Sequence, residues 1–134
     1  TEIPEEYQEL YAALQERGVS DVTIPTCIPN GFQVENSKLQ VIPEAQLIFC
    51  TISYSDGSNS ISFDFIWNDD TSGTLFEKDN EKVEVYSFDG VDYYIFTNNT
   101  QTVAAWNISN CEYSLSTALS SQELKKIINS ISKF

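Results

Sequence analysis

The sequence has no histidine and no methionine among its 134 residues, and it has only three cysteines. Histidine is the usual general base near neutral pH, and nucleophilic Ser–His and Cys–His pairs require it. Its absence excludes most hydrolase mechanisms. We therefore expect a domain that is not an enzyme.

Paired carboxylates are the remaining route to acid–base catalysis, since twenty Asp and Glu are present. Asp64 lies within an aromatic segment, but on the polar side of its alternation, which is typical of a solvated strand residue. An acidic glycan hydrolase would require two carboxylates that converge in a cleft with different environments. The sequence does not show such convergence, so it gives little support to a glycan hydrolase.

Positive charge is scarce, because seven Lys and Arg stand against twenty acids and the net charge is −13. Phosphate contacts need clustered Lys and Arg, so a nucleic-acid partner is excluded. The same charge repels an anionic membrane surface, and no apolar run approaches the roughly 20 residues needed to span a bilayer. We expect a soluble, monomeric domain.

The three cysteines, Cys27, Cys50 and Cys111, are far apart and form no C-x-x-C pair, which removes the simplest zinc and redox sites. They either pack as small apolar residues or include one disulfide, and the sequence does not choose the pair. The chain begins at Thr1 without a signal-like segment, so we expect that any export signal or anchor has been removed.

Apolar spacing predicts one helix at each end of the chain. Near the N-terminus, acids follow Pro4, Gly18 ends the segment, and the apolar residues between them repeat at i, i+3, i+4 and i+7. Near the C-terminus, Ser120 to Glu123 forms a capping box. The apolar residues on one face of this second helix are Leu124, Ile127, Ile128 and Ile131.

Between the helices the apolar period falls to two, which is typical of half-buried strands. After a Pro-rich extended segment, the strands begin at Phe32. The clearest are Leu47 to Tyr54 and Ile61 to Trp67, joined by the turn Ser55 to Asn59. The others are expected near 83–85, 91–97, 102–108 and 111–117.

These elements predict an α+β fold, in which a curved antiparallel meander sheet of about seven strands carries both helices on one face. The chain is expected to be a single domain over residues 1–134. The N-terminal helix would cover residues 1–18, the sheet 24–117 and the C-terminal helix 120–132.

Short segments resemble a known family in their order and spacing. They are Ile24-Pro25-Thr26, Pro29-Asn30-Gly31-Phe32, Tyr54-Ser55-Asp56-Gly57, Ile61-Ser62-Phe63, Val83-Glu84-Val85, Gly90, Trp106, Tyr113-Ser114-Leu115-Ser116 and Glu123 to Ile131. Over Ile24 to Ile131 the chain resembles the bacterial family catalogued as domain of unknown function 4367. The first helix and the Asp69 to Asn80 stretch fit that family poorly.

The resemblance implies an extracytoplasmic domain of a membrane-anchored protein, often one similar to anti-sigma factors, with no assigned catalytic residues. It therefore favours a sensor or protein-interaction domain whose partner is unknown. The alternative from the residues is a carrier of a small apolar ligand or lipid, in a cavity lined by Phe63, Phe65 and Trp67.

One loop-like segment resembles a calcium-binding loop. Counted from Asn68, oxygen-bearing residues stand at positions 1, 3 and 5, Gly73 at position 6 and an acid at position 12, as in such loops. The candidate ligands are Asn68, Asp70, Ser72 and Asp79. Asn replaces the usual first Asp, the last acid is shorter than the expected Glu, and the flanks resemble strands. A polar hairpin loop accounts for the same residues, and no other cofactor is indicated.

An aromatic surface is the second candidate site. Tyr94 and Phe96 share one face of their strand, and Trp106 lies on the next strand, so large apolar groups occupy both faces of this part of the sheet. If exposed, these three residues would contact a protein partner or ligand. Coverage by a terminal helix is the simpler alternative.

Overall fold

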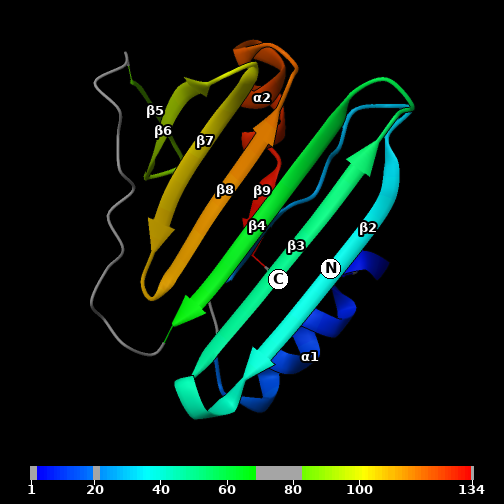
Figure 1. The fold of residues 1–134 in the computed structure, drawn as a ribbon. Helices are drawn as coiled ribbons and strands as arrows, with labels where there is room; N and C mark the ends of the chain where they lie inside the picture. Colours follow the sequence, from blue (N-terminus) through cyan, green and yellow to red (C-terminus); the bar gives the residue numbers. More distant parts are fainter. Residues whose placement is uncertain (1–2, 20–21, 69–82, 134) are drawn as a thin grey trace.

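The computed structural model describes residues 3–19, 22–68 and 83–133. Seven strands form one antiparallel sheet in the order β2-β3-β4-β8-β7-β6-β5 (Figure 1). Their bounds are β2 Gln33–Ile42, β3 Leu47–Ser55, β4 Ser60–Asn68, β5 Glu84–Phe88, β6 Val91–Asn98, β7 Gln101–Ile108 and β8 Cys111–Thr117. A second sheet pairs β1 (Thr23–Pro25) with β9 (Ile131–Lys133).

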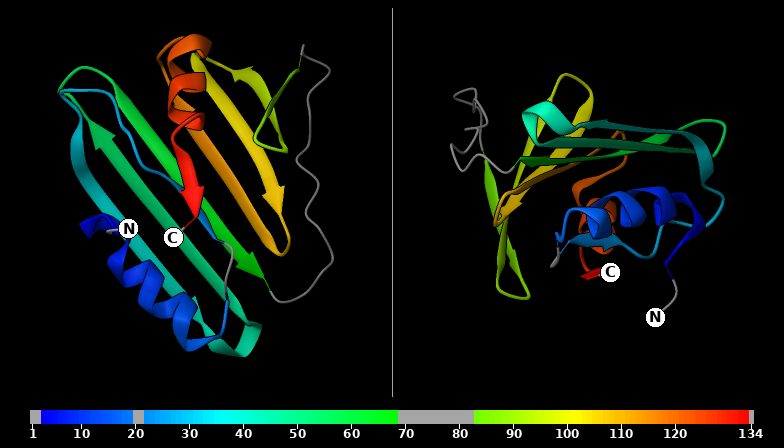
Figure 2. Two further views of the ribbon diagram at one scale, coloured as in Figure 1. Left: turned by 180° about the vertical axis from the view of Figure 1, so that it is seen from behind. Right: turned by 90° about the horizontal axis from the view of Figure 1, so that it is seen from below.

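Two helices and two 3-10 turns complete the described part of the chain. They are η1 Glu5–Tyr7, α1 Gln8–Glu16, η2 Pro43–Ala45 and α2 Ser121–Ile128. Both helices lie against the concave face of the large sheet, with the β1–β9 pair beside them (Figure 2). Within the described ranges, neither helix is long and apolar enough to cross a membrane.

The central strands alternate between buried residues and residues that are partly or fully exposed, as the period of two predicts. Phe63 of β4 lies opposite Ile52 of β3 and Leu115 of β8, and all three side chains are buried. The residues between them on each strand point to the other, outer face. The predicted fold class, a curved α+β sheet with both helices on one side, is confirmed.

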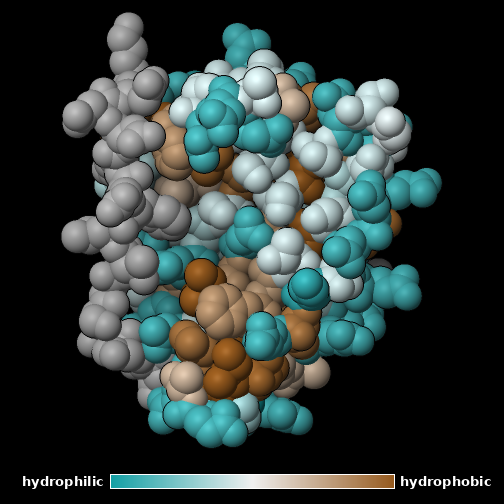
Figure 3. Space-filling model, in the orientation of Figure 1, coloured by the Kyte–Doolittle hydropathy of each residue, from teal (hydrophilic) through white to brown (hydrophobic). Residues whose placement is uncertain are grey.

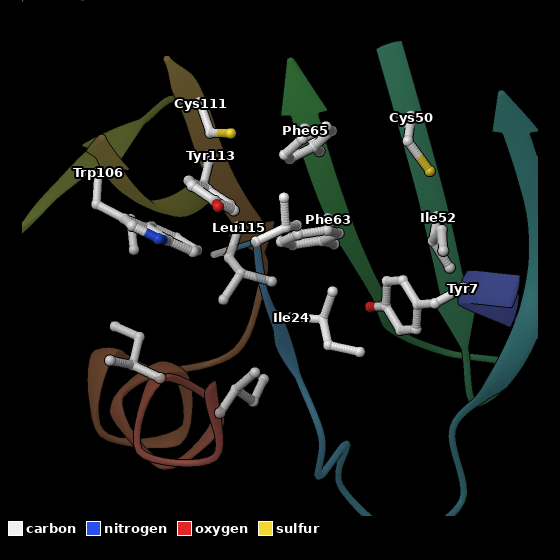
Figure 4. Packing of buried hydrophobic residues seen from close by; sticks show 14 of the residues in the cluster. Tyr7, Ile24, Cys50, Ile52, Phe63, Phe65, Trp106, Cys111, Tyr113 and Leu115 are labelled. Atoms are coloured by element: carbon white, nitrogen blue, oxygen red, sulfur yellow. The ribbon is translucent and has the colours of Figure 1, made fainter. Parts of the chain in front are cut away.

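Aromatic rings fill the space between the sheet and the helices (Figure 4). Tyr7 meets Phe63 edge to face at 5.8 Å between ring centroids, and Tyr113 meets Phe65 at 5.4 Å. Leu10 and Leu14 of α1 are buried in the same core, as are Leu124, Ile127 and Ile128 of α2. One hydrophobic core therefore joins both helices to the sheet.

The strand order departs from a simple meander at one place, because β4 pairs with β8 rather than with β5. Two blocks of consecutive strands, β2 to β4 and β5 to β8, thus join side by side. Both joining strands have fully buried inner faces, so their pairing places Phe63, Phe65 and Tyr113 together at the centre of the sheet.

The second helix ends earlier than predicted, at Ile128 rather than at residue 132. Ile131 lies instead in β9, opposite Pro25 of β1. The backbone N–H groups of Thr26 and Cys27 both donate to the hydroxyl of Ser130. This long-range pairing with the first strand overrides the helical spacing of Ile131.

Candidate interaction surfaces

The inner face of the sheet is closed by packed side chains. Phe63 and Phe65 are at most 1% exposed, and Trp67 is 8% exposed. Two surface pockets lined by described residues include none of these three aromatics. The residues expected to line a ligand cavity are thus part of the core.

Trp106 also belongs to this core. Its ring stacks on Tyr113 at 5.2 Å between centroids and tilts against Tyr93 at 4.9 Å. It is 1% exposed, and its buried indole N–H has no hydrogen-bond partner among the described residues. The strand register separates Trp106 from Tyr94 and Phe96, so the three predicted site residues do not form one surface.

Tyr94 and Phe96 lie half-buried on the outer face of β6. The register places Val85 of β5 beside Tyr94, and Val103 of β7 beside Phe96. Val85 is 55% exposed. We refer to these four residues, Val85, Tyr94, Phe96 and Val103, as the β5–β7 patch.

A second apolar group lies at the other end of the outer face, where β3 begins and β4 ends. Phe49 pairs across strands with Ile66, and Leu47 with Ile42 of β2, and all four are half-buried. Figure 3 shows a hydrophobic area over this end of the sheet. We refer to Ile42, Leu47, Phe49 and Ile66 as the β3–β4 patch.

Small polar side chains separate the two patches, as the hydrophilic surface across the middle of Figure 3 shows. Asp64 lies at the centre of this polar band. Its carboxylate accepts hydrogen bonds from Thr51 at 2.8 Å and from Ser114 at 3.4 Å. The outer face therefore combines two apolar areas with a central band of hydrogen-bonded polar side chains.

The edge of the sheet at β2 is a further candidate surface. Gln33 to Lys38 are all exposed, and a β-bulge interrupts the ladder between Val34 and Asn36. A groove of about 420 Å³ lies between this strand and the start of the N-terminal helical segment. Its lining residues are Glu5, Glu6, Gln8, Glu9, Val34 and Ser37.

All three cysteines are free thiols in the structure. Cys50 and Cys111 are buried on strands that β4 separates, whereas Cys27 is exposed. Burial raises the pKa of both buried thiols to about 11. Strands two positions apart lie roughly 9.5 Å from each other, too far for a disulfide, and a raised pKa disfavours the reactive thiolate.

The candidate calcium loop lies almost wholly outside the described residues. Of its predicted ligands, only Asn68 is described, and it is the last residue of β4. Its backbone N–H donates to the carbonyl oxygen of Asn110 at 3.1 Å. Asp70, Ser72 and Asp79 are not described, so the calcium prediction stays a prediction.

Sequence reasoning missed the β3–β4 patch and the β2 edge. The sequence did contain a signal for the patch. Phe49 and Ile66 occupy the alternate positions of their strands that otherwise carry polar residues. The sequence contained no signal for the β2 edge. Whether a strand lies at an edge depends on which strands pair, and strand pairing is a long-range property.

The fold is similar to that of solved structures of MucB. The chain matches MucB in the crystal structure of MucB in complex with MucA(peri), at a TM-score of 0.52 and 12% identity. The match covers 86% of this chain and 37% of that one. The complex of Pseudomonas aeruginosa MucA/MucB gives a TM-score of 0.51 at 12% identity, with 86% and 36% covered.

The chain thus spans just over a third of the length of the solved chains that it resembles, and at this identity the likeness shows the fold alone. No curated protein matches the sequence. The family model described as Domain of unknown function (DUF4367) matches residues 22–131, which is most of the chain. The chain therefore belongs to the DUF4367 family.

Proposed function

We propose that this chain is a non-enzymatic, extracytoplasmic sensor or protein-interaction domain of a membrane-anchored bacterial protein. The observation that carries the proposal is that the described helices cover only one face of the sheet. Both helices pack on the concave face, while the outer face keeps two partly buried apolar patches, one on each side of a polar band. Contiguous apolar groups bounded by polar residues are typical of protein-binding sites.

The comparisons support a protein partner indirectly. MucB, whose fold is similar, was solved in complex with MucA(peri). The family resemblance favours a position outside the cytoplasm and a membrane-anchored parent protein. Because the identity to MucB is only 12%, the likeness does not identify the partner of this chain.

The alternative functions have less support. A carrier needs an apolar cavity, whereas Phe63 and Phe65 pack against the rings of Tyr7 and Tyr113. An acid–base enzyme without histidine would need two carboxylates in different environments, and the carboxylate of Asp64 is held by two hydroxyl groups on the open face.

Photo-crosslinking in the native host tests the proposal. A photoreactive phenylalanine analogue replaces Phe49 in the β3–β4 patch or Phe96 in the β5–β7 patch, one at a time. The matched control positions are Ser58 and Thr100, which are exposed in turns outside both patches. We expect adducts with one discrete protein from at least one patch and none from the turns.

Adducts from all four positions in equal amount would contradict the proposal, because they would report random collision. The absence of adducts from both patches would contradict it as well. Turnover of a peptide or glycan by the purified chain would refute the non-enzymatic part of the proposal independently.

A further inference from the structure

Strand β2 offers an open backbone edge. Among the described strands its only ladder partner is β3, and the ladder runs in regular register from Asn36 to Ile42. In an edge strand, alternate residues direct their N–H and C=O groups away from the sheet. An extended segment of another protein can pair with those groups and lengthen the sheet by one strand.

The opposite edge is less accessible, because helix α2 is tied to β5. Lys125 of α2 forms an ion pair with Glu84, and its ammonium group lies 5.2 Å from the centroid of the Tyr86 ring. The Tyr86 hydroxyl donates to Asn129 at 2.7 Å. The β2 edge instead borders a groove, so β2 is the edge better suited to receive a strand.

The groove determines which side chains an added strand would need. Val34 and Ser37 pair with the buried residues Tyr54 and Ile52, so both belong to the inner side of β2. Across the groove from them stand the carboxylates of Glu5, Glu6 and Glu9. Side chains of an added strand that point inward would lie beside three negative charges.

The outer side of the same strand has the opposite preference. Lys38 lies opposite Thr51, whose side chain bonds Asp64 on the outer face, and Lys38 is exposed there. A basic residue pointing outward would be repelled by Lys38. Charge complementarity therefore selects a segment whose basic residues recur at every second position.

We infer that β2 accepts an extended segment of the partner protein as an additional strand, with Lys or Arg at alternate positions facing Glu5, Glu6 and Glu9. This inference rests on the proposed function and gives the partner a chemical class. The net charge of −13 would attract such a basic segment toward the domain before it pairs.

The test uses two synthetic peptides of about nine residues, which is within the usual range of strand lengths and matches the long strands of this sheet. In the first, Lys alternates with Thr; in the second, the same residues are arranged with all Lys in one run. Fluorescence anisotropy measures binding, and NMR measures amide exchange in β2. We expect the alternating peptide to bind about fivefold tighter and to slow exchange at backbone amides between Asn36 and Ile42.

Backbone N-methylation separates strand pairing from simple charge attraction. Because alternate amides of an added strand face β2, methylating either the Lys amides or the Thr amides should abolish binding, whereas methylating the other set should leave it intact. Equal binding by both methylated peptides would overturn the inference. So would equal binding by the alternating and the blocked peptide.

A double variant, Glu5→Gln with Glu9→Gln, tests the groove, since both side chains are exposed. We expect about fivefold weaker binding of the alternating peptide at low salt. The matched control is Glu16→Gln with Asp89→Asn, which changes the net charge equally at exposed positions elsewhere. An equal loss in both variants would overturn the inference.

The outcome also distinguishes this inference from the proposed function. If the alternating peptide does not bind but photo-crosslinking from the outer-face patches still gives adducts, only the strand pairing at β2 is wrong. If the adducts fail as well, the protein-interaction function itself is wrong.

Discussion

Three polar side chains form a short hydrogen-bonded chain where η1 meets the sheet. The Tyr54 hydroxyl donates to Glu6 Oε2 at 3.2 Å, and the Tyr7 and Tyr54 hydroxyl oxygens lie 2.9 Å apart. Since Tyr54 has one hydroxyl hydrogen, Tyr7 is the donor in the second bond. Burial raises the pKa of both tyrosines far above the usual value, so neither hydroxyl loses its hydrogen even in moderately alkaline solution.

Replacement of Tyr7 by Phe removes the buried donor of this chain. We expect a loss of about 1 to 2 kcal/mol in the free energy of unfolding, measured by urea denaturation. Tyr86→Phe is the control, because it removes a hydroxyl bonded at the surface, and should cost about 0.5 kcal/mol or less. Equal losses in the two variants would contradict a buried role for the Tyr7 hydroxyl.

The buried thiols of Cys50 and Cys111 predict a loss of stability at high pH. Their pKa values are about 11 in the folded chain, against an ordinary value of 9.0. Below pH 8 the thiols are protonated in both states and contribute no pH dependence. Above about pH 9 the unfolded chain loses these protons first, so stability falls as the pH rises toward 11.

Cys50→Val keeps an apolar side chain of similar size but has no ionisable group. Its melting temperature should therefore decline less between pH 8 and pH 10.5 than that of the unaltered chain. Exposed Cys27 provides the control, since Cys27→Val should leave the decline unchanged. Identical declines in all three proteins would show that Cys50 is not the source.

At the scale of elements, local chemistry determines where the second helix begins. Ser120 accepts a hydrogen bond from the backbone N–H of Glu123, as the capping box predicted. Buried Leu124, Ile127 and Ile128 hold the helix to the core. The start of α2 could thus be predicted from the sequence, whereas its end depended on the distant strand β1.

Ser120→Ala removes this cap from α2. We expect a loss of about 1 kcal/mol, or roughly 3 to 6 °C in the melting temperature for a chain of this length, measured by calorimetry. Gln122→Ala, an exposed change in the same turn, is the control and should have little effect. A melting temperature unchanged by Ser120→Ala would mean that packing alone fixes the helix start.

The strands that are joined by tight turns could also be predicted from the sequence. The turn after Ser55 is held by Asp56, whose carboxylate accepts from the backbone N–H groups of Ser58 and Asn59. The pairing of β4 with β8 was not readable, because it joins segments separated by some fifty residues. The same limit hid the edge position of β2.

At the scale of the whole molecule, the two faces of the sheet differ in how they are packed. The inner face holds the fold together through aromatic contacts such as that between Phe65 and Tyr113. The outer face leaves Phe49 and Phe96 only partly buried although full burial would be favourable. On our account, a protein partner completes the burial of that outer face.

The most direct test of this account compares the affinity for the crosslinked partner with the stability of the same variants. Phe49→Ser and Phe96→Ser should each weaken partner binding about tenfold or more if their patch is used. Each should lower the free energy of unfolding by about 1 to 2 kcal/mol, because both side chains are only partly buried. Ser58→Ala should change neither quantity. If neither Phe variant weakens binding while both remain folded, the outer face is not the interaction surface and the central claim fails.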